Sequence, residues 1–376
     1  MQRIYLDYNA STPIAPEVVA AMRPYLDEGF GNPSSGHWAG LPAREAVERA
    51  RGQVAGLLGC AHDEVVFTSG GSEANNHALK GVAFALRGKG NHIVTSAIEH
   101  PAILKPCEHL SKLGLDITHV PVDRFGCVDP VDIRRAITPR TILVSIMHAN
   151  NEVGTIQPIE QISRITRERG ILLHTDAAQS VGKISTNVED LSVDLMSIAG
   201  HKFYAPKGIG ALYIRRGTAI EPLVHGAGHE AGRRAGTESA LLCTALGAAA
   251  ELAADLKPMS RVRELRDSFW QQLDAALGNR IVLNGHPTYR LPNTLNVSFV
   301  GQVGADILAS LAGVAASTGS ACHSGRIELS PVLRAMGITP EVGMGAIRFS
   351  LGRATTHSEI DSIVAKISET VGETSG

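Results

Sequence analysis

Short apolar runs alternate with longer amphipathic segments through the first two-thirds of the chain. Apolar residues recur at helical spacing in segments 72–88, 131–138 and 159–170, and Gly170 is a typical helix stop. Five mostly apolar runs are typical of buried strands: EVVFTSG (64–70), HIVTSAIEH (92–100), TILVSIMHAN (141–150), ILLHTDAAQ (171–179) and DLMSIAGHK (194–202). Strands that alternate with helices predict an α/β fold, with a mostly parallel central sheet and helices on both faces.

The pattern changes in the last third of the chain. An alanine-rich helical stretch over 244–256 is followed by Pro258, and the region from about 259 onward has helices and strands of its own. We therefore expect a large domain over residues 15–257. Residues 1–14 and 258–376 are expected to form a smaller α+β domain. The sequence has no internal repeat and no low-complexity segment.

The composition is that of a globular protein with little net charge. The 376 residues are 44% hydrophobic and 19% charged, and the formal net charge is −2, which disfavours nucleic acid as a partner. No apolar run is long enough to span a membrane, and the N-terminal segment has no apolar signal core. The cysteines are scattered without metal-type spacing, so we expect no metal site and reduced thiols in the cytoplasm: Cys60, Cys107, Cys127, Cys243 and Cys322.

Lys202 is the first candidate for chemistry. It follows a Gly-His turn in SIAGHKFYAPKG (197–208), shortly after an apolar strand that ends in Asp176. Enzymes that use pyridoxal phosphate (PLP) hold its aldehyde with a lysine and its pyridine nitrogen with an acidic residue. Asp176 and Gln179 would serve the ring nitrogen and the phenolic oxygen. The alternatives are a surface lysine on a glycine loop and an aspartate that caps the next helix.

Other polar residues also follow predicted strands, where ligands bind in parallel sheets. The turn TSGGSEANN (68–76) offers backbone N–H groups to a phosphate, although Ser72 as a plain helix cap explains it equally well. It lacks the GK[ST] ending of a nucleotide-binding loop. His100 is suited to stack on a flat ring and move protons, or it is structural. Asn150 and Asn151 either contact a ligand or form a turn.

Two candidates lie late in the chain. Cys322 stands in STGSACHSG (317–325), and its glycine-rich surroundings suggest an accessible nucleophile rather than a buried thiol. Arg348 lies inside an apolar strand, where it needs an anionic partner. A substrate carboxylate and an internal salt bridge both satisfy that need.

Together these segments resemble the cysteine desulfurases, which are class-V-type members of the fold-type-I PLP enzymes. The resemblance covers nearly the whole chain, and the matching motifs are YLDYNASTP (5–13), FGNPSS (30–35), FTSGGSEANN (67–76), SAIEH (96–100), HANNEVG (148–154), HTDAAQ (174–179), GHKFYAPKGIGALY (200–213), GHEAGRRAGT (228–237), TGSACHSG (318–325) and IRFSLGR (347–353). The stretches ACHS and HKFYAP also resemble the related selenocysteine lyases.

The resemblance implies a role for each matching residue. It implies that Lys202 bonds covalently to PLP and that Cys322 attacks the sulfur of the substrate. The other implied roles are ring stacking and acid–base steps for His100, the ring nitrogen for Asp176, the ring oxygen for Gln179, the phosphate for Gly71, Ser72 and His201, the partner subunit's phosphate for Thr237, and the substrate carboxylate for Asn151 and Arg348. The role of Thr237 implies a homodimer.

The implied reaction converts L-cysteine to L-alanine and leaves a persulfide on Cys322, which passes to a sulfur acceptor such as an iron–sulfur scaffold protein. A selenocysteine lyase and a PLP-fold sulfur-relay protein with little activity are the alternatives. The sequence departs from the family pattern at Ala199, where the family commonly has a serine that binds the phosphate. The lost hydrogen bond to a charged group is expected to weaken phosphate binding by about 1.5–3 kcal/mol.

Overall fold

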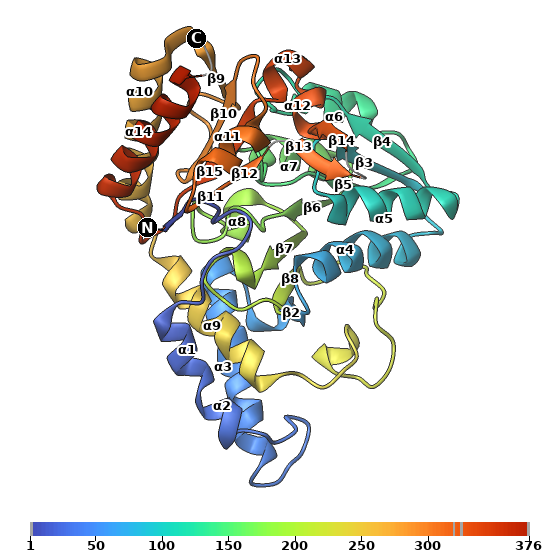
Figure 1. Ribbon diagram of the computed structural model, residues 1–376. Coiled ribbons are helices and arrows are strands. Elements are labelled where there is room, and N and C mark those ends of the chain that lie inside the picture. The colour runs from blue at the N-terminus through green and yellow to red at the C-terminus, as the bar shows by residue number, and fades with distance from the viewer. Residues whose placement is uncertain (1–2, 319, 324–325, 374–376) are drawn as a thin grey trace.

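A computed structural model describes the backbone of residues 3–318, 320–323 and 326–373, and side chains within 3–318 and 328–371. Its centre is a seven-stranded sheet in the order β2-β8-β7-β6-β5-β3-β4 (Figure 1). The strands are β2 (Val65–Thr68), β3 (His92–Ser96), β4 (Asp116–Val120), β5 (Thr141–Ser145), β6 (Leu172–Asp176), β7 (Leu195–Ala199) and β8 (Gly210–Ile214). All neighbouring pairs are parallel except those made by β8, which runs antiparallel to both β2 and β7. The predicted α/β fold with a mostly parallel sheet is confirmed.

Helices cover both faces of this sheet and enclose two separate cores. Helices α4 (Gly71–Ala85) and α5 (Pro101–Lys112) pack on one face, through residues such as Leu79 and Ile103 (Figure 1). The opposite face is covered by α1 (Pro16–Met22), α3 (Gly40–Leu58), α6 (Pro130–Ala136), α7 (Ile159–Glu168), α8 (Val188–Leu191) and α9 (Ala240–Ala254). Two-sided burial explains why the inner strands are continuously apolar rather than alternating.

The last third of the chain forms a second sheet with a core of its own. Strands β9 (Ile281–Asn284), β10 (Thr294–Phe299), β12 (Ser317–Thr318) and β15 (Ala346–Ser350) are antiparallel in the order β12-β15-β10-β9. Helices α10 (Pro258–Leu277), α11 (Gly304–Ser310) and α14 (His357–Glu373) contribute to the core beside it. The same core takes in Ile4 and Leu6, and β1 (Ile4–Tyr5) pairs with β11 (Val314–Ala315). We propose on this basis that residues 15–257 form one domain and that residues 1–14 join 258–376 in the other.

A two-stranded hairpin stands apart from both sheets. Strand β13 (Ser320–His323) pairs with β14 (Arg326–Leu329), and the backbone of Cys322 lies opposite Ile327. The side chain of Cys322 lies outside the described residues. Helix α12 (Pro331–Ala335) begins directly after the hairpin, and Ser330 caps it through hydrogen bonds from the backbone N–H groups of Val332 and Leu333.

The short elements that remain are α2 (Pro24–Asp27), α13 (Pro340–Gly343) and the 3₁₀ turns η1 (His62–Glu64), η2 (Gly200–Lys202), η3 (Glu230–Gly232) and η4 (Gly278–Arg280). No helix of the described residues is both long and apolar enough to cross a membrane.

Candidate active site

A cleft of about 550 Å³ opens at the carboxyl ends of the central strands, where the sequence predicts the site. It is lined by side chains that follow different strands. Asp176 ends β6, while His100 and Lys202 lie a few residues beyond β3 and β7. Arg348, from β15 of the second sheet, also lines the cleft. His100, Asp176 and Lys202 therefore line the same cleft as Arg348 from the other part of the chain.

Lys202 ends the 3₁₀ turn η2 with its amine directed at the N-terminal segment. Its Nζ donates hydrogen bonds to the backbone oxygens of Asn9 at 2.7 Å and Ala10 at 2.9 Å. Burial lowers the pKa of Lys202 to about 8, the positive charge of Arg348 adds to this effect, and Asp176 and Asp7 oppose it. The hydrogen-bond partners of the amine are neutral carbonyl groups rather than carboxylates, and its lowered pKa makes it available as a base.

Asp176 is a buried carboxylate with a fixed orientation. Its Oδ2 accepts a hydrogen bond from the side-chain amide of Asn75 at 2.7 Å, and its Oδ1 accepts from the backbone N–H of Ala178 at 2.9 Å. No described cation forms an ion pair with it, although a buried carboxylate needs compensation. The carboxylate of Asp176 can therefore accept a further hydrogen bond from a donor in the cleft. It does not cap a following helix, because none begins there.

His100 caps a helix and also lines the cleft. Its side chain caps α5, because Nδ1 accepts a hydrogen bond from the backbone N–H of Ala102 at 3.1 Å. In the neutral ring the proton must then reside on Nε2. Burial lowers the pKa of His100, Asp176 opposes the shift, and the positive charge of Lys202 supports it. A neutral imidazole with its N–H free for the cleft is thus favoured near neutral pH.

The glycine-rich turn after β2 forms the other end of the cleft. Helix α4 begins at Gly71, and the residue at its N-cap is Gly70 with φ +143°, a conformation that favours glycine. Ser72 lies within the first turn and is not the cap. The ideal Cβ of an alanine at Gly71 would lie 3.1 Å from Cβ of Ala199, so the turn packs closely on β7. His201 is beside it, and burial lowers the pKa of His201 to about 4, with Lys202 and Lys207 adding to the effect.

Asn9 is the main residue that the sequence reasoning missed. It is 1% exposed and joins the N-terminal segment to both sheets. Its backbone oxygen accepts hydrogen bonds from Gln179 Nε2 at 3.0 Å and from Lys202, while its Oδ1 accepts from Lys183 at 3.2 Å and Asn293 at 3.0 Å. The motif YLDYNASTP contains it, but no local pattern signals a residue whose side-chain partners lie 142 or more residues away.

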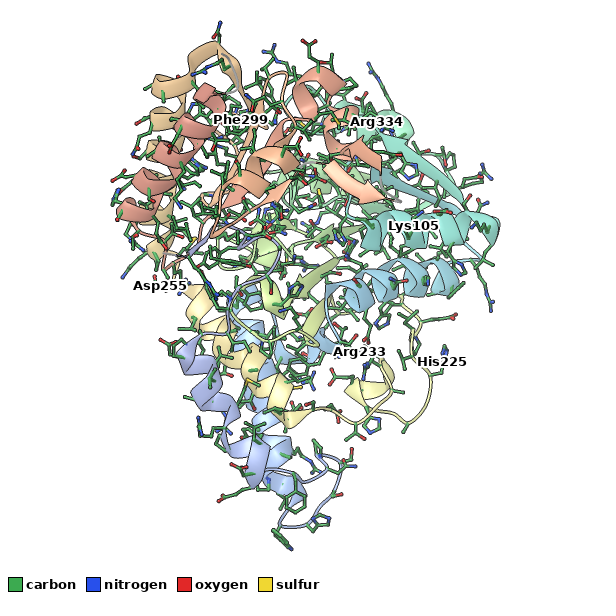
Figure 2. The ribbon with its side chains drawn as sticks, in the orientation of Figure 1. Lys105, His225, Arg233, Asp255, Phe299 and Arg334 are labelled. Atoms are coloured by element: carbon green, nitrogen blue, oxygen red, sulfur yellow. The ribbon has the colours of Figure 1, made fainter. Side chains whose placement is uncertain are left out.

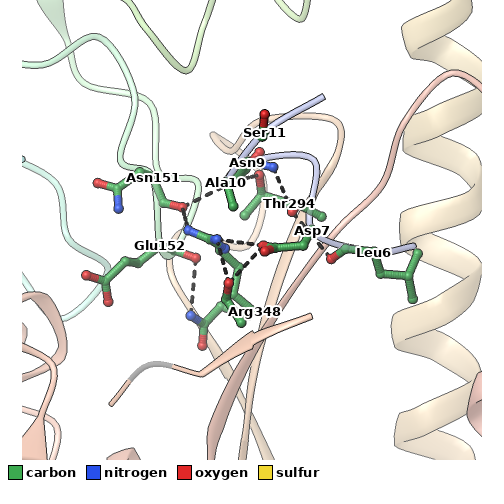
Figure 3. Close-up of polar contacts among 12 residues, drawn as sticks. Leu6, Asp7, Asn9, Ala10, Ser11, Asn151, Glu152, Thr294 and Arg348 are labelled. Atoms are coloured by element: carbon green, nitrogen blue, oxygen red, sulfur yellow. Dashed lines mark hydrogen bonds and ion pairs between the residues drawn. The ribbon is translucent and has the colours of Figure 1, made fainter. Parts of the chain in front are cut away.

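Arg348 is held by an internal salt bridge at the mouth of the cleft (Figure 3). Its Nη2 contacts Asp7 Oδ1 at 2.8 Å and Ser317 Oγ at 3.0 Å, and its Nη1 donates to the backbone oxygen of Asn151 at 2.9 Å. Asn151 lines the cleft and its side-chain amide points away from this cluster in Figure 3. Asn150 is different, because its side chain is used within the turn by bonds to Ile98, Glu152 and Val153.

Thr237 is the one predicted cofactor ligand with a described side chain that does not line the cleft of its own chain. It is exposed on the loop that leads into α9. Cys322 is placed only by the pairing of its backbone in β13, so its distance from Lys202 is not defined by described atoms.

The family model for class-V aminotransferases matches residues 4–363. The chain belongs to the class-V aminotransferase family. A cysteine desulfurase IscS from Dictyoglomus turgidum is 51% identical over 365 residues, which cover 96% of this chain and 92% of that relative. A solved NifS-like protein is 37% identical with a TM-score of 0.92, and covers 99% of this chain and 100% of its own. A second structure, described as SspA in complex with cysteine, is 36% identical with a TM-score of 0.84 over 94% of this chain and 100% of its own. The predicted resemblance is confirmed.

This class-V aminotransferase family depends on PLP, as the sequence predicts. The cleft fits PLP by the chemistry of its groups. Nδ1 of His201 is buried without a partner among the described residues, and with the N-terminus of α4 it suits a phosphate. Asp176 suits a pyridine N–H, and Lys202 suits an aldehyde.

Proposed function

We propose that this chain is a cysteine desulfurase, which converts L-cysteine to L-alanine and holds the sulfur as a persulfide on Cys322. The observation that carries the proposal is the environment of Lys202 in a cleft that also contains Asp176 and His100. With a pKa of about 8, about a tenth of the lysine amines are neutral at pH 7. An ordinary lysine is neutral in only about one molecule in a few thousand. The names of the relatives support cysteine as the substrate.

We propose that the two ends of the cleft hold PLP in a single orientation. Asp176 contacts the ring nitrogen because Asn75 and Ala178 leave its carboxylate with spare acceptor capacity. Lys202 supplies the covalent bond, and the other proposed contacts are Gln179 at the ring oxygen, His100 and Asn151 beside the ring, Gly71, Ser72 and His201 at the phosphate, and Thr237 at the phosphate of a second subunit.

When bound, PLP supplies a sink for the electrons that are released at Cα of the substrate. The chain's own residues then move the protons. The neutral amine of Lys202 takes the proton from Cα, and His100 presents its Nε2 proton because Nδ1 is fixed by α5. Arg348 and Asn151 orient the substrate carboxylate. Nε of Arg348 is buried without a partner among the described residues, which leaves the guanidinium a donor for that anion.

Cys322 performs the sulfur step in this proposal. Its thiolate attacks Sγ of the substrate, so an S–S bond forms and the Cβ–Sγ bond breaks. The carbon fragment keeps the electron pair, takes up a proton and leaves as alanine. Cys322 lies in the hairpin β13–β14, which is followed in the chain by α12. Cys322 therefore belongs to the smaller domain proposed above, whereas Lys202 belongs to the larger one.

The proposed partners follow from the same residues. Thr237 is exposed and does not line the cleft of its own chain, which supports a homodimer in which it reaches the second cleft. The persulfide would pass to an acceptor protein such as an iron–sulfur scaffold. A cytoplasmic location is supported by four free thiols, Cys60, Cys107, Cys127 and Cys243, among the described residues. Nucleic acid and membranes remain unexpected partners.

The function is tested by supplying L-cysteine to the holoenzyme and measuring alanine release together with protein-bound sulfur. Cys322→Ala should retain the cofactor's absorbance, carry no persulfide, and lose nearly all alanine formation. Cys127→Ala is the matched control, because it removes a half-buried free thiol elsewhere and should behave like the wild type. Full activity of Cys322→Ala on cysteine would contradict the proposed mechanism.

The alternatives are separated by the same assay with L-selenocysteine. Rapid turnover of selenocysteine without turnover of cysteine would identify a selenocysteine lyase. A chain that turns over neither amino acid but accepts sulfur from another persulfide would be a relay protein.

A further inference from the structure

Lys183 is a buried lysine that the proposed reaction does not use. It is 8% exposed and lies just beyond β6, four residues after Gln179. Its Nζ donates hydrogen bonds to Gln179 Oε1 at 2.9 Å and to Asn9 Oδ1 at 3.2 Å. The salt bridges of the described residues do not include it. A lysine buried against two amide oxygens needs an explanation, because such groups are normally solvated or paired with a carboxylate.

The contact with Gln179 fixes which way its amide faces. A lysine amine donates hydrogen bonds, so the atom of Gln179 that faces Lys183 must be the oxygen. The amide nitrogen then faces the opposite side, where Nε2 donates to the backbone oxygen of Asn9 at 3.0 Å. That same oxygen accepts the hydrogen bond from Lys202 at 2.7 Å. Lys183, Gln179, Asn9 and Lys202 therefore form one continuous hydrogen-bonded chain.

The charges around Lys183 add to this arrangement. Burial lowers the pKa of Lys183 well below its usual value, and the positive charges of Lys202 and Arg348 lower it further. The amine donates to two amide oxygens, Oε1 of Gln179 and Oδ1 of Asn9.

We propose that Lys183 is a positioning residue that locks the side-chain amide of Gln179 with Nε2 turned toward the cleft. The inference rests on the proposed function, in which Gln179 donates to the ring oxygen of PLP. Without Lys183 the amide keeps, among its described contacts, only the bond from Nε2 to the backbone oxygen of Asn9, an acceptor that it shares with Lys202. It then rotates more readily and presents its oxygen, and the ring oxygen loses a donor. An anionic oxygen that loses a hydrogen-bond donor binds protons more tightly. The proton equilibrium of the bound cofactor should therefore depend on a residue that does not line the cleft.

The test is a spectroscopic pH titration of the cofactor's absorbance in the holoenzyme. Lys183→Met keeps the length of the side chain and removes the donor, and it should raise the titration midpoint by about one pH unit. Gln179→Met should produce a similar rise. Because both act through one hydrogen bond, the double variant should rise no further than either single variant. Ile162→Val, a buried change on α7, is the control for a loss of stability alone and should not move the midpoint.

A second variant reports on the same contact through stability. Gln179→Glu places a carboxylate against Lys183, and it also replaces the bond to the backbone oxygen of Asn9 by an oxygen–oxygen contact. Its Tm is therefore compared with that of Lys183→Met/Gln179→Glu, which has the same contact but no amine, and the single variant should have the clearly higher Tm. If Lys183 does not face residue 179 in solution, the two Tm values are equal. This comparison needs no bound cofactor, so it decides the matter even where Lys183→Met does not take up PLP.

The inference is overturned by an unchanged midpoint in Lys183→Met, by additive shifts in the double variant Lys183→Met/Gln179→Met, or by equal Tm values of Gln179→Glu with and without Lys183→Met. A wild-type protein that takes up no PLP would instead contradict the proposed function, and the two failures are thereby distinguished.

Discussion

Buried charges are treated differently in two regions of this molecule. Below the central sheet, Arg51 of α3 and Glu230 of η3 form a bidentate pair with contacts of 2.7 and 2.9 Å, and Glu230 also accepts the backbone N–H of Phe67. Burial opposes the charged form of Arg51, but the hydrogen bonds and charge of Glu230 outweigh it and raise the pKa. Lys202 in the cleft and Lys183, which does not line it, face carbonyl and amide oxygens instead, and their pKa values are lowered.

The charged groups of the first region stabilise the fold, whereas we propose that those of the cleft take part in the reaction. The pair in the first region fixes the loop of η3, where Glu230 and Ala231 have φ values of +50° and +55°. Lys202 in the cleft has a pKa shifted toward neutral pH and is poised in this sense, and so is Glu99, which precedes His100 in the chain but does not line the cleft. Glu99 accepts from Ser96 and the backbone N–H of Met147 but has no ion pair among the described residues, and burial raises its pKa to about 8. Poised groups are those that move protons near neutral pH.

The largest effect is expected from Lys202→Ala. Loss of the residue that we propose to take the Cα proton should slow alanine formation about a thousandfold. Lys105→Ala is the matched control, because this lysine on α5 is exposed and pairs with Glu108, away from the cleft (Figure 2). Turnover of cysteine by Lys202→Ala at the wild-type rate would show that Lys202 has no role in the reaction.

Arg51→Met should act on stability instead. Leaving Glu230 as an unpaired buried carboxylate is expected to cost about 3–5 kcal/mol in the free energy of unfolding, measured with denaturant. Cofactor absorbance per folded molecule should stay unchanged. If the variant were as stable as the wild type but could not bind PLP, the contrast between the two regions would be wrong.

Glu99→Gln should remove a pH dependence of stability. The folded carboxyl group has a pKa near 8, above its unfolded value, so its contribution is present in full below the unfolded pKa and is lost as pH rises through about 8. The wild type should lose about 2 kcal/mol relative to the glutamine variant between pH 6 and 8, on a slope of about 1.4 kcal/mol per pH unit that flattens as the pH approaches 8. Parallel stability curves for the two proteins would show that Glu99 ionises normally.

Ala199→Ser is expected to give the smallest change. Ala199 is 3% exposed, and its Cβ faces the turn at Gly71. A hydroxyl there would donate to the phosphate and tighten PLP binding by about 1.5–3 kcal/mol. PLP retention during dialysis reports this directly, and Ala178→Ser, at another position that lines the cleft, tests whether any added hydroxyl suffices. Equal retention in the wild type and Ala199→Ser would show that the missing serine is unimportant.

The sequence was sufficient to predict the layers of the fold and the strand ends that carry the site. Five continuous apolar runs marked β2, β3, β5, β6 and β7, because strands buried on both faces need no alternation. It did not predict β4, an edge strand with only Val120 buried, or the antiparallel direction of β8. Strand direction depends on pairing between distant segments, which no local pattern encodes.

Sequence motifs predict the individual site residues that they contain. They do not predict residues whose importance comes from long-range contacts. Lys202, Asp176 and His100 lie together as expected. Asn9 and Lys183 were missed, because their importance lies in hydrogen bonds that span 174 residues. The sequence does not identify the partner of Arg348, because Asp7 lies next to it only in the folded chain.

The measurement that tests this account most directly is the pKa of Lys202. The enzyme freed of PLP is labelled with an amine-reactive anhydride at a series of pH values, and modification of Lys202 is followed by mass spectrometry. We predict half-maximal reactivity near pH 8. A midpoint near the ordinary lysine value of about 10.4 would show that Lys202 is an ordinary cation and would contradict the account.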